Sequence, residues 1–235
     1  MYLYPSCNLS TTDLREFPGG TIYNGDCLEA IKTLPAASVD CVITDPPYFL
    51  GMTHNGQKGA FKDLSICRPF YRELFEEFRR VCRPEACIYF ICDWRGYAFY
   101  YPLFDEILKA HNMLVWDKLS GPGNHYAFIH ELVLFHAGKG ANIGGTNIIS
   151  DIKSFTSGAK STDGAKVHPT QKPVSLIQKF IADATKPGDV ILNTFGGSGT
   201  TAVAAVRSGR RFILMEQDEG YYHTACKRLE DEYRQ

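Results

Sequence analysis

The chain has 235 residues, of which 44% are hydrophobic and 22% are charged, with 25 basic and 26 acidic side chains. This length and composition suit one globular domain over residues 1–235. No apolar run approaches the roughly 20 residues that a membrane-spanning helix needs, and residues 1–20 lack a basic segment followed by an apolar one. We therefore expect a cytoplasmic protein without a membrane anchor. A net charge of −1 over the whole chain argues against a strongly basic nucleic-acid-binding protein.

The cysteines give no sign of a metal site or a disulfide framework. They stand at positions 7, 27, 41, 67, 82, 87, 92 and 226, and no two form a Cys-x-x-Cys pair. Structural zinc sites usually have closely spaced ligands, so we predict no metal. Most of these cysteines lie in apolar runs, which indicates buried thiols in a reducing compartment.

Hydrophobic periodicity predicts strands that alternate with helices along most of the chain. The predicted strands are 21–23, 39–44, 86–92, 113–116, 132–136, 189–192 and 211–215. The predicted helices are 26–34, 71–81, 100–111, 174–184, 198–208 and a final helix from 218 onward. Residues 49–67 and 138–166 contain many glycines and polar residues and are predicted to be loops. This alternation is typical of an α/β fold with a mostly parallel sheet that helices cover on both faces.

A glycine-rich segment, 193–201, lies between a predicted strand and a predicted helix. Gly197, Gly199 and Ala202 fit the pattern G-x-G-x-x-A of nucleotide-binding loops, and Glu216 ends the next predicted strand. An acidic residue there can accept hydrogen bonds from both hydroxyls of a ribose. A strand-to-helix turn without a ligand is the alternative. The motif by itself does not separate a dinucleotide from S-adenosylmethionine.

A second motif, Asp45-Pro46-Pro47-Tyr48, follows the predicted strand 39–44. Ligands of open α/β sheets bind beyond the carboxyl ends of the strands. The two prolines fix the backbone and have no N–H, so the Asp45 carboxylate and the Pro46 carbonyl form a rigid patch of acceptors. Such a patch beside the ring of Tyr48 suits an exocyclic amino group on a flat base. A rigid turn with an exposed aspartate is the alternative.

Together these motifs resemble those of the DNA amino-methyltransferases, which methylate N6 of adenine or N4 of cytosine. Thr44 to Tyr48 comes before the glycine loop Phe195 to Thr200, and this order resembles the circularly permuted beta class of the family. The likeness covers most of the chain. It implies the Rossmann-like methyltransferase fold and S-adenosylmethionine as cofactor. The family's cytosine-N4 members more often carry serine at the position of Asp45, so the resemblance favours adenine N6.

The resemblance also implies roles for individual residues. Asp45, Pro46, Pro47 and Tyr48 would be catalytic, with the target base flipped out of the duplex and stacked on Tyr48. Asp26 and Cys27 would lie near the adenine of the cofactor, and Thr170 and Lys172 near its methionine end. The remaining expected cofactor residues are Asn193, Phe195, Gly196, Gly197, Ser198, Gly199, Thr200 and Glu216. Asn193 stands where the family often has Asp, which keeps an acceptor but loses the charge that would hold the cofactor's ammonium group.

Two basic segments are expected to face double-stranded DNA. Residues 49–72 and 138–172 each carry a net charge of +3, so the remainder of the chain carries −7. We predict DNA-facing loops at 49–70 and 138–167, with a further contribution from 118–130. The expected DNA contacts are Lys58, Lys62, Arg68, Asn124, Lys153 and Lys160.

Trp116-Asp117-Lys118 and His130-Glu131 also resemble family segments, but the sequence assigns them no role. The resemblance makes a homodimer plausible. Two other functions stay open on the residues alone. An NAD-dependent oxidoreductase would use the same glycine loop but would leave residues 45–48 and 168–173 without a role. An inactive DNA-binding relative is suggested only by Asn193.

Overall fold

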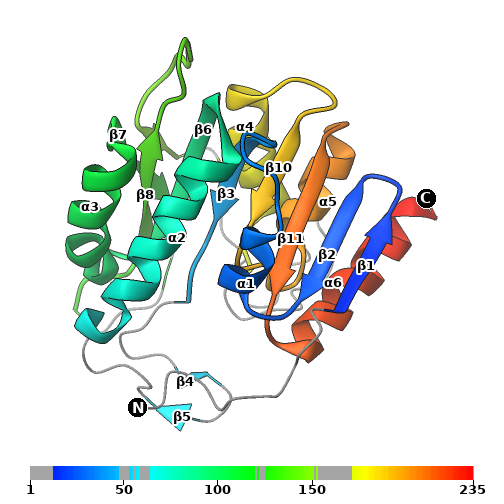
Figure 1. Cartoon of the computed structure of the whole chain (residues 1–235). Coiled ribbons are helices and arrows are strands. Elements are labelled where there is room, and N and C mark those ends of the chain that lie inside the picture. The colour runs from blue at the N-terminus through cyan, green and yellow to red at the C-terminus, as the bar shows by residue number, and fades with distance from the viewer. Residues whose placement is uncertain are drawn as a thin grey trace.

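The fold is described by a computed structural model that covers residues 13–47, 53–54, 57–58, 64–119, 121, 125–150, 152 and 171–234. For residues 53–54, 57–58 and 64–65 it describes the backbone alone. Within this part of the chain, the centre of the molecule is a nine-stranded sheet with α-helices packed against it (Figure 1). The strands follow one another across the sheet in this order: β1 (Asp13–Phe17), β2 (Gly20–Asn24), β11 (Arg211–Glu216), β10 (Val190–Asn193), β3 (Val39–Thr44), β6 (Cys82–Cys92), β8 (His130–His136), β7 (Asn112–Asp117) and β9 (Ile148–Ile149).

The helices connect these strands, and some of them begin at an aspartate that caps their first turn. Asp26 accepts hydrogen bonds from the backbone N–H groups of Leu28 and Glu29 and so caps the first helix, as an aspartate at this position is expected to do. Asp93 caps the third helix in the same way through Gly96. The helices are α1 (Cys27–Lys32), α2 (Arg68–Val81), α3 (Trp94–Leu108), α4 (Val174–Ala184), α5 (Thr200–Arg207) and α6 (Glu219–Tyr233), with a 3₁₀ turn η1 (Leu64–Cys67) and a separate pair of short strands, β4 (Thr53–His54) and β5 (Gln57–Lys58).

Five neighbouring strands of the sheet, β2, β11, β10, β3 and β6, run parallel to one another. β1 pairs antiparallel with β2, and β8 runs antiparallel to both β6 and β7. The predicted α/β fold with a mostly parallel sheet is therefore confirmed. The motif 45–48, which is predicted to be catalytic, follows β3, and the glycine loop follows β10, so the permuted order of the two motifs is also present in the fold.

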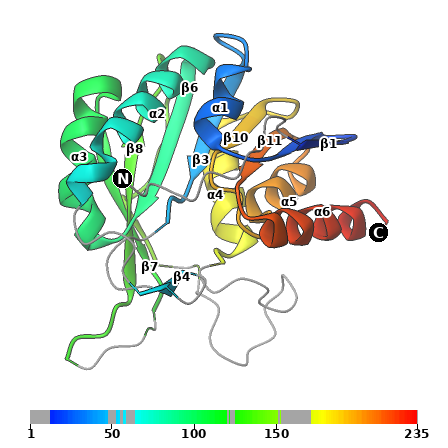
Figure 2. The same cartoon turned by 60° about the horizontal axis from the view of Figure 1, so that its bottom comes forward.

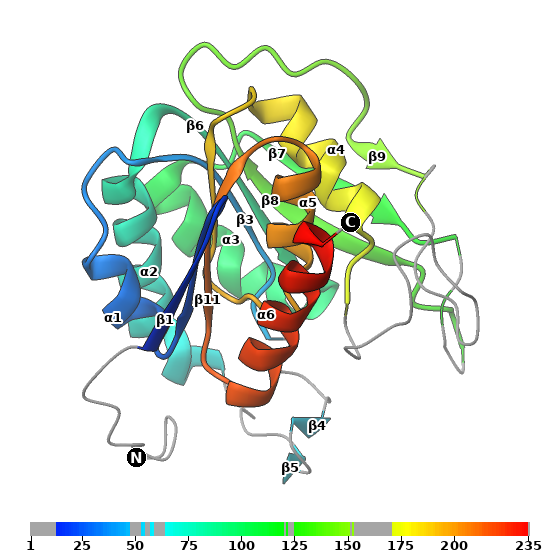
Figure 3. The same ribbon diagram turned by 90° about the vertical axis from the view of Figure 1, so that its right-hand side faces the viewer.

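Two hydrophobic layers hold the helices to the sheet. Side chains of α4, α5 and α6 form one buried cluster on one face, and side chains of α1, α2 and α3 form the other cluster on the opposite face. Figure 3 shows the two groups of helices on either side of the strands. Because β3 is covered on both faces, five of its six residues are buried, which explains its largely apolar sequence. Six of the seven described cysteines are buried, as expected.

Several sequence predictions need correction. Residues 64–70, expected to belong to a DNA-facing loop, form η1 and the first turn of α2. β9 interrupts the predicted loop 138–166. α3 begins six residues before the predicted start at Tyr100, because Asp93 caps it.

The carboxyl ends of the parallel strands meet at one edge of the sheet. This is the lower edge in Figure 1, and it comes forward in Figure 2. The ladder pairs Glu216 with Asn24 and places Asn193 one residue beyond the pair Leu192 and Val42. Residues that end β2, β11, β10 and β3 are thus neighbours although they come from both ends of the sequence. Among the described residues, no helix has the length and apolar character needed to cross a membrane.

Candidate active site

The two motifs found in the sequence meet at the carboxyl edge of the sheet. Thr44, the last residue of β3, donates its hydroxyl to Asn193 Oδ1 at 3.0 Å and lies 3.0 Å from the hydroxyl of Thr194. Asn193 and Thr194 are the residues that open the glycine loop, and Asp45 comes directly after Thr44. The structure therefore brings the start of the motif 45–48 next to the glycine loop, although Thr44 and Asn193 are 149 positions apart in the sequence.

Close packing explains two glycines of the loop. Gly199 has a φ of +82°, and a Cβ at this position would lie 2.9 Å from the Cβ of Ala225 in α6. Gly196 donates its N–H to the carbonyl of Met215 at 2.7 Å, and a Cβ there would lie 2.7 Å from Leu214 Cγ. The loop thus lies directly on β11 and α6, and it leads into the amino terminus of α5, which has no side-chain cap.

Glu216 closes this loop from the next strand. Its Oε2 accepts the N–H of Gly197 at 2.6 Å, and its Oε1 accepts the N–H of Asp218 at 2.8 Å. Burial raises the pKa of Glu216 above its ordinary value, although the backbone donors at Asp218 and Gly197 act in the opposite direction. Each carboxylate oxygen keeps a second lone pair, so the group can still accept hydrogen bonds from ribose hydroxyls.

Asp26 and Cys27 lie beside Glu216 because the N–H of Gly25 bonds to the Glu216 carbonyl at 3.0 Å. The Oδ1 of Asp26 is used as the cap of α1, so a contact with a ligand would have to share this oxygen or use the other one. Cys27 is 7% exposed, and burial raises the pKa of its thiol. The thiol is therefore protonated and apolar in character at neutral pH.

Asn193 is held entirely within the protein. Its Oδ1 accepts hydrogen bonds from Thr44 Oγ1 and from the N–H of Phe195, and its Nδ2 donates to Thr201 Oγ1 at 2.9 Å. The residue is 5% exposed. In this chain the amide joins β3, the glycine loop and α5.

An arginine that the sequence did not single out supports the loop from behind. Arg228 of α6 donates to the carbonyl of Ser198 at 2.7 Å, to its hydroxyl at 3.1 Å, and to Thr200 Oγ1 at 3.3 Å. Both Ser198 and Thr200 are buried, at 3% and 8% exposure. Two of the expected cofactor residues thus direct their hydroxyls toward α6. Arg228 has no local sequence signal, since it lies 28 residues beyond the motif.

The catalytic aspartate predicted from the sequence is part of an ion pair. Asp45 Oδ2 lies 2.5 Å from Lys172 Nζ, and the two side chains are 20% and 6% exposed. Lys172 Nζ also lies 3.2 Å from Glu131 Oε2, and Glu131 Oε1 lies 3.4 Å from Lys118 Nζ. Burial lowers the pKa of Lys172, but the carboxylates of Asp45 and Glu131 outweigh this and raise it, so the ammonium is charged. Lys172, which the resemblance places near the methionine end of the cofactor, is thus paired with Asp45, the first residue of the motif 45–48.

Pro46 is buried and Pro47 is half-buried beside Asp45, and Phe195 packs near Phe70 of α2, with ring centroids 6.4 Å apart. Of the expected DNA contacts, Arg68 is exposed at the start of α2, and Lys58 belongs to β5, where only the backbone is described. The other predicted site residues lie outside the described residues: Tyr48, Lys62, Asn124, Lys153, Lys160 and Thr170. Among the residues that are described, no three His, Cys, Asp or Glu side chains are placed to hold a metal ion.

These residues fit S-adenosylmethionine. The glycine loop gives a close backbone approach, Glu216 offers acceptors at the end of the adjacent strand, and Phe195 adds an apolar ring beside the loop. The fold and this site together define the class of Rossmann-like S-adenosylmethionine-dependent methyltransferases.

Comparison with known proteins agrees with this class and narrows it. The model of the DNA methylase family N6_N4_Mtase matches residues 39–227. The chain therefore belongs to the N6-adenine/N4-cytosine DNA methyltransferase family, and it uses S-adenosylmethionine.

Relatives with known names or structures include three that are informative. The DNA adenine methyltransferase YhdJ of Escherichia coli K12 is 28% identical, over 89% of this chain and 82% of its own length. The crystal structure of the M1.HpyAVI–SAM complex is 27% identical with a TM-score of 0.66, and the match covers 88% of this chain and 98% of that one. The cytosine-N4-specific PvuII DNA methyltransferase shares the fold at a TM-score of 0.70 and 19% identity, with 92% of each chain covered.

Proposed function

We propose that this chain transfers a methyl group from S-adenosylmethionine to N6 of adenine in double-stranded DNA. The observation that carries the proposal is the position of Asp45, which follows β3 next to the glycine loop and is held there by Lys172 and by the contacts of Thr44. A carboxylate and a proline carbonyl at one point accept the two hydrogens of an exocyclic amino group. The cofactor supplies the electrophilic methyl on its sulfonium.

The residues of this chain act mainly by positioning. Asp45 and the Pro46 carbonyl would orient the amino group so that its lone pair faces the methyl, and alignment of this kind is a large part of catalysis. The neutral amino group is a very weak acid and does not need to lose a proton before transfer. After transfer the methylated nitrogen is cationic and gives up a proton readily. The target nitrogen is out of reach inside a duplex, so the base would be flipped out, at a cost of a few kcal/mol.

Adenine is favoured over cytosine on two grounds. Asp45 stands where the cytosine-N4 members more often carry serine, and the E. coli relative is named an adenine methyltransferase. The shared fold with the PvuII enzyme favours neither base. An oxidoreductase would leave the Asp45–Lys172 pair and residues 45–47 without a role, and the family match favours the methyltransferase.

Transfer of labelled methyl from S-adenosylmethionine to unmethylated duplex DNA, followed by digestion to nucleosides, tests the proposal. We expect labelled N6-methyl-2′-deoxyadenosine. Labelled N4-methyl-2′-deoxycytidine would refute the choice of base, and no transfer would favour an inactive DNA-binding relative. Asp45→Ala should abolish transfer while calorimetry still detects cofactor binding, because the glycine loop is untouched. Asp231→Ala, an exposed change on α6, serves as the control.

DNA binding by the two basic loops remains part of this proposal, as do a homodimer and a cytoplasmic location. Each lost phosphate contact should reduce the slope of log affinity against log salt concentration by about 0.9. Neutralising Lys58, Lys62, Lys153 and Lys160 together should therefore flatten that slope. An unchanged slope would place the DNA footprint elsewhere on the molecule.

A further inference from the structure

Two sequence segments without an assigned role converge on the catalytic motif. Lys118 follows the end of β7, and Glu131 is the second residue of β8. The ladder pairs Trp116 with Glu131, so Lys118 and Glu131 lie at the same end of the β7–β8 pair. Lys172 reaches this point from the segment before α4, and Asp45 reaches it from the end of β3. Four elements thus contribute one charged side chain each to a single cluster.

The four side chains alternate in charge. Lys118 contacts Glu131 at 3.4 Å, Glu131 contacts Lys172 at 3.2 Å, and Lys172 contacts Asp45 at 2.5 Å. All four are largely buried, with side-chain exposures of 16%, 13%, 6% and 20% in that order. Buried charges persist only when they are paired, and here each ion has an opposite neighbour. Lys172, the most buried of the four, lies between the two carboxylates and is held from both sides.

This arrangement restricts Asp45 in two ways. Its Oδ2 is fixed on the Lys172 ammonium, which sets the rotation of the carboxylate at the point where the amino group would bind. The single positive charge of Lys172 is shared between two carboxylates, those of Glu131 and Asp45, so it does not neutralise Asp45 completely. The carboxylate of Asp45 thereby keeps the negative character that a hydrogen-bond acceptor for the amino group needs.

We propose that Glu131 is a positioning residue for methyl transfer, which acts on Asp45 through Lys172 and is itself held by Lys118. The inference rests on the proposed function of Asp45. It gives the segments 116–118 and 130–131 a part in the active site that their sequence did not reveal. Lys118 and Glu131 would not touch the reacting atoms.

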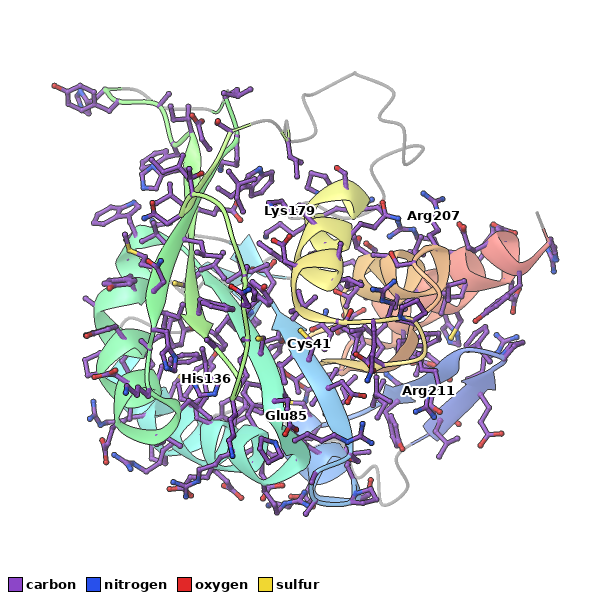
Figure 4. The ribbon with its side chains drawn as sticks, turned by 90° about the horizontal axis from the view of Figure 1, so that it is seen from above. Cys41, Glu85, His136, Lys179, Arg207 and Arg211 are labelled. Carbon is purple, nitrogen blue, oxygen red and sulfur yellow. The ribbon has the colours of Figure 1, made fainter. Side chains whose placement is uncertain are left out.

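The test removes the charge of Glu131 with little change of shape. Glu131→Gln should lower kcat by about 10- to 100-fold, since small displacements of a reacting group have effects of this size. The KM for DNA and the dissociation constant for S-adenosylmethionine should stay within a few-fold of wild type. Glu85→Gln is the matched control, because Glu85 is exposed near the amino end of β6, away from the carboxyl edge (Figure 4). A kcat for Glu131→Gln equal to that of Glu85→Gln would overturn the inference.

The dependence of kcat on pH separates positioning from general support of the fold. Loss of the negative charge of Glu131 leaves Lys172 to act on Asp45 alone, so the acid limb of the profile should move to lower pH. Lys172→Gln removes the positive charge and should move the limb to higher pH. Among the described residues, Cys92 at the end of β6 interacts with Asp45 and Glu131, and also with Asp93, which is paired with Arg95; these three residues are unchanged in the variants. If the acid limb of the kcat profile lay at the same pH in the wild type, Glu131→Gln and Lys172→Gln, the inference would be overturned.

A double-mutant cycle tests the route through Lys172. If Glu131 acts only through that residue, Glu131→Gln should cause no further loss of kcat in the Lys172→Gln background. Full additivity of the two effects would refute this route. If Glu131→Gln fails to fold because Lys118 loses its partner, Lys118→Gln/Glu131→Gln leaves the outer charge balanced and should show the same loss of kcat. Absence of methyl transfer by the wild-type protein would refute the proposed function itself, whereas an active wild type with unaffected variants would refute only the inference.

Discussion

Gly199 offers a sharp test of how the glycine loop is held, because one added methyl group meets two separate obstacles. Its φ of +82° belongs to the left-handed region, which costs a residue with a Cβ about 1–2 kcal/mol. The new Cβ would also lie 2.9 Å from the Cβ of Ala225, and overpacking of this kind costs about 1–3 kcal/mol. Gly199→Ala should therefore lower the unfolding free energy by roughly 2–5 kcal/mol.

Two other glycines separate these contributions. Gly209 has a φ of +68° and nothing within 4 Å of an added Cβ, so Gly209→Ala should show the backbone cost alone. Gly196 is not in the left-handed region, but its Cβ would lie 2.7 Å from Leu214 Cγ, so Gly196→Ala should show the steric cost alone. For a chain of this size about 1 kcal/mol corresponds to a shift in Tm of about 2–4 °C.

Thermal unfolding and calorimetry of S-adenosylmethionine binding measure the outcome. Gly199→Ala should lower Tm more than either control and should weaken binding by tenfold or more, because the loop has to move away from α6. Gly209→Ala should leave the dissociation constant unchanged. If Gly199→Ala lowered Tm no more than Gly209→Ala, the packing of the loop on Ala225 would not be the constraint described here.

Changes at three further residues test the same edge of the sheet. Glu216→Gln loses one of the two acceptors for backbone N–H groups and should weaken S-adenosylmethionine binding; equal affinity by calorimetry would argue against its role. Because burial raises the pKa of Glu216, the folded state binds the proton of this carboxyl group more tightly than the unfolded state does. The contribution of Glu216 to the unfolding free energy therefore falls as the pH rises through the pKa of the folded state. Glu216→Gln should remove this fall when melting is measured as a function of pH. Asn193→Ala leaves the hydroxyl of Thr201 and other partners unsatisfied and should cost about 2–4 kcal/mol in denaturant unfolding, whereas Asn193→Asp keeps its acceptors and should cost clearly less; the reverse order would contradict the hydrogen bonds described. Arg228→Met loses its bonds to Ser198 and should raise the dissociation constant for the cofactor more than it lowers kcat at saturation, and unchanged binding would show that the loop needs no support from α6.

Strong periodicity was a reliable guide to the fold. The predicted bounds of β3 and α4 agree with the structure, since both elements have faces that are buried in the core. β1 could not be found in this way: four of its five residues are exposed, and the strand exists because it pairs with β2. β9 has two residues in a glycine-rich segment, which is too short for any periodicity.

The site was predictable in its chemistry but not in its internal contacts. Residue types and strand ends located Asp45, the glycine loop and Glu216 at one edge of the sheet. The pairing of Lys172 with Asp45 joins residues 127 positions apart and depends on where two loops place their side chains. The buried hydrogen bonds of Asn193 and the support from Arg228 are of the same kind. No spacing in the sequence encodes such contacts.

The order of the strands also has a consequence for the way the molecule is made. β2 and β3 follow each other closely in the sequence, but β11 and β10 lie between them in the sheet. A growing chain therefore holds two open strand edges until residues 190–216 have been synthesised, and open edges invite pairing with other chains. Insertion of β10 and β11 into this gap closes the sheet and at the same step completes the cofactor site, because Glu216 then meets Asn24 and Gly197. We expect a ribosome-bound chain that lacks these two strands to be unable to hold the methyl donor, so that binding reports completion of the fold.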